Sequence, residues 1–119
     1  MSRICTSIDQ SNKLIKLGID VNTADMYYAF LNRIDKYATV PTVLDEEKYV
    51  FINDIPAWSL SALMDLMPNI NGHYPELCRG KLTGEYYMWI EGIFDTQTFN
   101  NPIDSAFEMI CWFLENKEI

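Results

Sequence analysis

The chain has 119 residues, which is the length of one ordinary domain and predicts a single globular domain over residues 1–119. Hydrophobic residues make up 49% of the chain and charged residues 22%, which excludes the disordered class and allows a core without disulfide or metal cross-links. Seventeen acidic and nine basic side chains leave a net charge of -8, with Lys and Arg scattered, which argues against direct binding of nucleic acid or an anionic membrane.

The first predicted element is a short amphipathic helix. Ser7-Ile8-Asp9-Gln10 has the form of a capping box, in which the Ser and Gln side chains each accept a backbone hydrogen bond at the start of a helix. Gly18 is suited to the position just after a helix ends. We therefore expect a helix between Ser7 and Gly18 that needs the rest of the chain to cover its apolar side.

The next part of the chain favours extended structure. The apolar residues of Met26–Leu31 also suit one face of a helix, but the aromatic enrichment and the shortness of the run favour a strand. Residues 32–37 supply turn chemistry, and residues 40–44 predict an edge strand because a proline cannot donate to a central ladder. We also expect a solvated loop at residues 45–47 and a short extended piece at residues 49–52.

Residues 54–68 predict a buried central helix. Pro56 has a fixed φ suited to the start of a helix, Ser59 can cap its amides, and Pro68 ends it. Four apolar residues fall on one stripe of this helix: Leu60, Leu63, Met64 and Met67. Trp58 is expected to hold the helix against the sheet, and only an exposed Trp58 would make the segment a binding surface.

A β-hairpin is predicted over residues 76–93, with its bend at residues 82–84. Residues 85–91 are apolar on both faces, as expected of a central strand. A C-terminal helix follows, with Asn101 as N-cap and Pro102 at its first position. Its apolar stripe includes Phe107 and Cys111 and is widened by Trp112, which indicates a helix wedged into the core or partly covered by a partner.

These elements together predict an α+β domain. We expect an antiparallel sheet of about three to five strands, packed against N-terminal, central and C-terminal helices. The chain shows no internal repeat and no low-complexity segment.

The sequence predicts neither a metal nor another cofactor. Cys5, Cys78 and Cys111 are odd in number and far apart, which disfavours a disulfide framework and fits a reducing cytoplasm. There is one histidine and no C-x-x-C pair, so a tetrahedral metal site has no support, and Cys111 is interpreted as a buried thiol. No signal peptide or membrane-spanning run is evident, so a cytoplasmic protein is expected.

Catalysis is the less favoured hypothesis. Glu91, Asp95 and Asp104 near the end of the hairpin could converge as an acid–base pair, and Cys78 with His73 could form a thiol–imidazole pair. Carboxylates that flank strands and cap helices are more often surface groups, and no supporting motif surrounds the Cys and His. A small hydrolase-like enzyme therefore remains an alternative.

Aromatic residues are more numerous than solubility requires, since the chain has three Trp, seven Tyr and six Phe. Trp58, Tyr86 and Trp89 are candidates for contact with a partner, although core packing is the default for Trp. The leading hypothesis is a non-enzymatic binding protein whose partner is another protein or a second copy, as in a homodimer. An acidic DNA mimic that inhibits a DNA-binding protein is a further alternative.

Three segments carry a resemblance to a known group: residues 5–11, residues 23–26 and residues 106–112. With these segments the chain resembles uncharacterised small acidic proteins found in phage and mobile-element gene sets of gut anaerobic bacteria. The resemblance implies a phage-related accessory role. It implies no activity, cofactor or catalytic residue.

Overall fold

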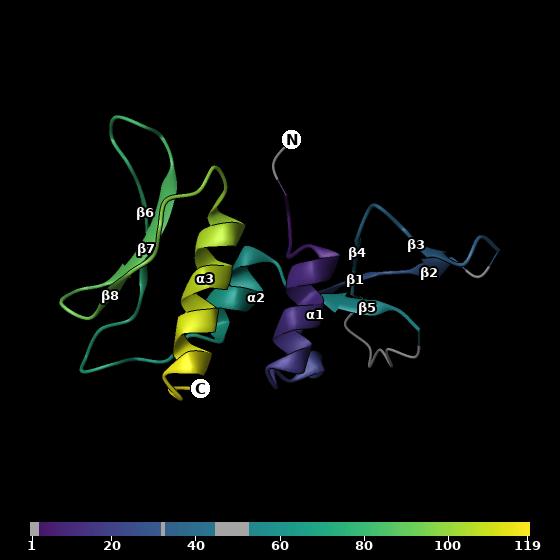
Figure 1. Cartoon of the computed structure of the whole chain (residues 1–119), viewed down its shortest axis with the longest axis horizontal. Coiled ribbons are helices and arrows are strands. Elements are labelled where there is room, and N and C mark those ends of the chain that lie inside the picture. The colour runs from purple at the N-terminus through teal and green to yellow at the C-terminus, as the bar shows by residue number, and fades with distance from the viewer. Residues whose placement is uncertain (1–2, 32, 45–52) are drawn as a thin grey trace.

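The computed structural model describes residues 3–31, 33–44 and 53–119, and within these ranges the protein is an α+β domain (Figure 1). Its helices are α1 (Ile8–Lys16), α2 (Leu60–Asp65) and α3 (Pro102–Glu115), with one 3₁₀ turn, η1 (Val21–Thr23). Its strands are β1 (Met26–Tyr28), β2 (Phe30–Leu31), β3 (Lys36–Tyr37), β4 (Thr42–Val43), β5 (Ile55–Ala57), β6 (Glu76–Arg79), β7 (Tyr86–Ile90) and β8 (Phe94–Asp95). The expected fold class is confirmed, and the strands are divided among three antiparallel sheets of order β4-β1-β5, β2-β3 and β6-β7-β8.

Helix α1 begins with the expected capping box. The Ser7 hydroxyl accepts the Gln10 amide at 3.1 Å, and the Gln10 side-chain oxygen accepts the Ser7 amide at 3.0 Å. Gly18 follows the helix with φ +103°, a conformation that favours glycine. The local signals at both ends of this helix therefore predicted its position.

The first sheet confirms extended structure in residues 26–28 and 42–43, but the strand predicted over residues 26–31 divides at Ala29 into β1 and β2, which belong to different sheets. Strand β1 lies at its centre and β4 at its edge, as the proline near β4 indicated. Pro56, however, lies in edge strand β5 opposite Tyr27 and does not start a helix. The fixed φ of proline suits an edge strand as well as a helix start, so α2 begins only after Ser59, whose hydroxyl accepts the Ala62 amide at 3.2 Å.

Two further differences concern short elements. Residues 36 and 37, expected as part of a turn, form β3 and pair with β2, and β8 was not expected. The loop predicted at residues 45–47 and the extended piece at residues 49–52 lie outside the described residues.

The hairpin of β6 and β7 and the central position of β7 are confirmed. Side chains alternate across β7, so Met88 and Ile90 are fully buried on the face packed against α3. The opposite, outer face carries Tyr87 and Trp89, which are only half-buried.

The main core lies between α3, α2 and the β6-β7-β8 sheet, where Trp58 is fully buried. Its indole N–H donates to the Thr23 hydroxyl at 2.9 Å, which satisfies the buried donor. A smaller apolar cluster lies on the β4-β1-β5 sheet. The molecule measures 50 × 31 × 24 Å, and the β2-β3 hairpin and the β6-β7-β8 sheet lie toward its opposite ends (Figure 1). No helix among the described residues has the length and hydrophobicity needed to cross a membrane.

Candidate functional site

Helix α3 has two faces with different environments. The face toward the core consists of residues that are fully or almost fully buried: Ile103, Ala106, Met109, Ile110 and Phe113. The other face follows the spacing i, i+3, i+4, i+7, i+8, i+11 and lines an open cleft: Asp104, Phe107, Glu108, Cys111, Trp112 and Glu115. One helix thus contributes both to the core and to a concave surface.

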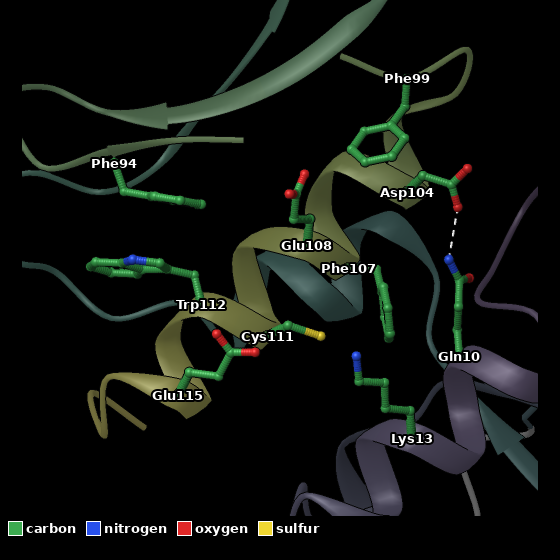
Figure 2. Close-up of a pocket in the computed structure, with 10 residues that line it drawn as sticks. All are labelled: Gln10, Lys13, Phe94, Phe99, Asp104, Phe107, Glu108, Cys111, Trp112 and Glu115. Atoms are coloured by element: carbon green, nitrogen blue, oxygen red, sulfur yellow. Dashed lines mark hydrogen bonds between the residues drawn. The ribbon is translucent and has the colours of Figure 1, made fainter. Parts of the chain in front are cut away.

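The cleft, called the α3 cleft below, has a volume of about 550 Å³. Gln10 and Lys13 of α1 form one wall, while Phe94 of β8 and Phe99 from the segment before α3 form the other (Figure 2). This volume is within the range of ligand-binding pockets. Because the walls come from separate parts of the chain, the cleft exists only in the folded protein.

Aromatic rings cover much of the α3 cleft. The Phe94 and Trp112 rings stack with centroids 5.0 Å apart and planes 11° apart, as Figure 2 shows. Phe99 is held by two backbone hydrogen bonds to Tyr86, of 2.7 and 2.8 Å. The Lys13 ammonium lies 5.7 Å from the centroid of the Phe107 ring, so one cation already contacts a ring of the cleft within the protein.

Three carboxylates add negative charge to the cleft, against the single ammonium of Lys13. Asp104 is held by an ion pair with Arg3 and accepts hydrogen bonds from the side chains of Gln10 at 2.7 Å and Asn101 at 2.9 Å. In the described part of the chain Glu108 accepts a hydrogen bond from the Gln97 amide at 3.0 Å, and Glu115 is exposed. The charges of Glu108 and Glu115 are therefore less engaged within the protein than that of Asp104 and more open to a ligand.

Cys111 lines the cleft but is poorly placed to act as a nucleophile. Burial raises the pKa of its thiol, Lys13 opposes this shift, and the negative charges of Glu115 and Glu108 add to it. A thiol with a raised pKa stays protonated at neutral pH. This agrees with the interpretation of Cys111 as a buried apolar thiol.

The catalytic candidates do not gather in one of the described pockets. Asp104 lines the α3 cleft, whereas Asp95 lines a separate pocket at the β7–β8 turn, and neither pocket includes Glu91. Cys78 lies on the outer face of the sheet, where a hydrogen bond from its neighbour Tyr87 raises the pKa of that tyrosine. His73 is exposed in the turn before β6. Among the described residues no group of His, Cys, Asp and Glu could hold a metal ion.

The three partner-contact candidates lie in different places. Trp58 is fully buried, so it does not form a surface. Tyr86 and Trp89 are three residues apart on β7 and therefore face opposite sides of the sheet, Tyr86 beneath the Arg79 guanidinium and Trp89 on the outer face. The Trp89 indole N–H is buried without a hydrogen-bond partner in the described part of the chain.

Sequence reasoning missed most of the α3 cleft. The apolar stripe predicted for the last helix includes Phe107, Cys111 and Trp112. Phe107 and Trp112 do pack against the core and Cys111 is buried, but the stripe did not indicate that these residues also line a cleft. One signal in the sequence could have indicated the cleft. It is a second stripe at helical spacing that begins at Asp104 and contains both carboxylates and aromatic rings. Lys13 and Phe94 could not be added from sequence because nothing local brings them to this helix.

No family model matches the chain, and neither a curated protein nor a solved structure matches it. The resemblance to small acidic phage-related proteins therefore stays a prediction.

Proposed function

We propose that the protein is a non-enzymatic binding protein and that its α3 cleft takes a segment of a partner protein with a basic side chain among apolar ones. The observation that carries this proposal is the combination of ring-lined walls with an excess of carboxylates. A guanidinium or ammonium is attracted to ring faces and to carboxylates, while apolar neighbours gain from contact with the rings. Such a role also fits the phage-related accessory function that the resemblance implies.

The chemistry of the α3 cleft supports binding more than catalysis. Its thiol has a raised pKa, and Asp104 is held by three neighbouring side chains as a structural link. A catalytic nucleophile would need an adjacent base within hydrogen-bond reach. The cleft offers instead a fixed aromatic surface with negative charge at its border.

The α3 cleft is also a better docking site than the pocket beside Trp89. All residues that line the latter pocket fall within residues 89–95, so it is a hollow of a single turn. The α3 cleft draws on two helices, a strand and a loop, which gives it walls on more than one side. A concave site can bury more of a ligand than a local depression.

Two small peptides that differ only in charge test this proposal. Acetyl-Leu-Arg-Leu-amide should bind more tightly than acetyl-Leu-citrulline-Leu-amide by about three- to tenfold, because citrulline has the shape of arginine without its charge. Isothermal titration calorimetry measures both affinities.

Glu108→Gln should weaken binding of the arginine peptide and leave the citrulline peptide almost unaffected, because the glutamine keeps an oxygen that can accept the Gln97 amide. Glu91→Gln removes an exposed carboxylate outside the cleft and is the matched control. Equal affinity for the two peptides, or an equal effect of the two substitutions, would contradict the proposal.

A further inference from the structure

The β2-β3 hairpin presents an exposed apolar surface, which we call the hairpin surface and define by four residues: Leu31, Arg33, Ile34 and Lys36. Leu31 and Ile34 are 40% and 59% exposed, and with Arg33 they border one shallow hollow. None of the four belongs to either core cluster. Clustered exposed apolar residues mark interaction sites more often than isolated ones do.

The hairpin is linked to the segment that leads into β5. The Asp54 carboxylate accepts the Phe30 amide at 2.7 Å, and the Phe30 and Tyr37 rings contact each other with centroids 5.2 Å apart. The two strands form a sheet of their own with two residue pairs. A two-stranded hairpin is marginally stable by itself, so a surface that covers its exposed side would stabilise it.

The charge of the hairpin surface is opposite to that of the α3 cleft. Arg33 and Lys36 flank the exposed Ile34, with Asp35 as the only acidic residue of the turn, in a chain whose net charge is -8. The cleft contributes Glu108 and Glu115 beside its rings. The proposed function requires a ligand with a basic side chain next to apolar ones, and the hairpin surface has this composition.

We propose that the hairpin surface of one copy docks into the α3 cleft of a second copy. This inference rests on the proposed function and names the partner segment. In Figure 1 helix α1 lies between the hairpin and α3, so a hairpin does not face the cleft of its own chain. A guanidinium or ammonium of the hairpin lies against the cleft rings near Glu108, and Ile34 contacts the apolar wall.

Such a contact joins two different surfaces. Unless two copies exchange hairpins reciprocally, each pair keeps one unused hairpin and one unused cleft, and the assembly grows into rings or chains. This distinguishes the proposal from a symmetric homodimer, in which the same patch of both copies meets.

Mixing two complementary variants tests the proposal by analytical ultracentrifugation. Ile34→Asp keeps an intact cleft and loses the hairpin surface, while Glu108→Lys keeps the hairpin surface and loses the cleft. Each variant alone should associate about tenfold or more weakly than the wild type. The equimolar mixture should form a dimer with one copy of each variant and nothing larger, because only one productive pair of surfaces exists.

Leu82→Asp is the matched control, since Leu82 is fully exposed at the tip of another hairpin and should not change association. A wild type that stays monomeric at millimolar concentration, or a mixture no better associated than its components, overturns the inference. Binding of the arginine peptide distinguishes failure of the self-association from failure of the proposed function. If the peptide still binds the cleft of a monomeric wild type, the cleft takes a basic segment from elsewhere and only the self-association is wrong.

Discussion

At the scale of the residue, burial decides which aromatic and thiol groups can meet a ligand. Trp58 was a partner candidate because of its residue type, but it is fully buried and its indole donates to Thr23. Trp112 is partly buried against the core and also lines the α3 cleft. The same residue type has two roles because tertiary contacts, and not local sequence, determine exposure.

Cys5 carries a prediction about stability and pH. It is 2% exposed, its sulfur lies 3.6 Å from the Tyr28 hydroxyl, and burial raises the pKa of its thiol. The folded state thus holds the proton more tightly than the unfolded state, whose thiol pKa is about 8.5. The stabilisation is complete below that pH and is lost as the pH rises through the folded-state pKa.

The free energy of unfolding of the wild type should therefore fall between neutral pH and mildly alkaline pH. A thiol whose pKa is raised by folding contributes at most about 1.4 kcal/mol per pH unit to the decrease in the free energy of unfolding with pH. Cys5→Ala should therefore make this decrease less steep. Urea unfolding at a series of pH values measures it. A slope that is unchanged in Cys5→Ala would show that this thiol is not the cause.

At the scale of the element, capping signals predicted where helices begin. Residues that suit more than one backbone conformation gave less reliable predictions. Ser7 with Gln10 and Asn101 with Pro102 gave the starts of α1 and α3, because these signals act within a few residues. Pro56 misled because its φ suits two kinds of backbone. Strand β8 has only two residues, too few for a periodic pattern.

Asp104 links three elements, and its removal should be costly. Its carboxylate contacts Arg3 of the N-terminal segment, Gln10 of α1 and Asn101 at the start of α3. Asp104→Asn should lower the free energy of unfolding by about 1–2 kcal/mol, a range limited by the partial exposure of the ion pair. Urea unfolding measures the change.

The control for Asp104→Asn is Asp9→Asn, which removes an exposed carboxylate from the first turn of α1. That change should cost about 0.3–1 kcal/mol, the usual contribution of such a charge to a helix start. If the two substitutions cost the same, the contacts of Asp104 with other elements do not stabilise the protein.

At the scale of the whole molecule, the α+β class was predictable and the site was not. Helix and strand patterns in the sequence were sufficient to predict helices at both ends and in the middle. The α3 cleft, in contrast, brings together Lys13, Phe94 and Trp112, which are far apart in the chain. The division into three sheets also depends on long-range pairing, such as that between Tyr27 and Pro56.

The net charge of -8 affects any assembly of this protein. Copies with the same net charge repel one another, while the basic hairpin surface and the acidic α3 cleft attract locally. The balance predicts association that is weak and specific. The acidic charge of the α3 cleft also explains why the cleft would bind a neutral ligand less tightly than a cationic one.

The most direct test of the central claim is to locate a bound basic peptide on the protein. A spin label attached to acetyl-Leu-Arg-Leu-amide broadens nearby amide signals in the NMR spectrum of the ¹⁵N-labelled protein. We predict broadening along the cleft face of α3, at Phe107 and Cys111, and at the Trp112 indole. Broadening centred on Trp89 at the outer sheet face, or spread evenly over the protein, would contradict the assignment of the α3 cleft as the binding site.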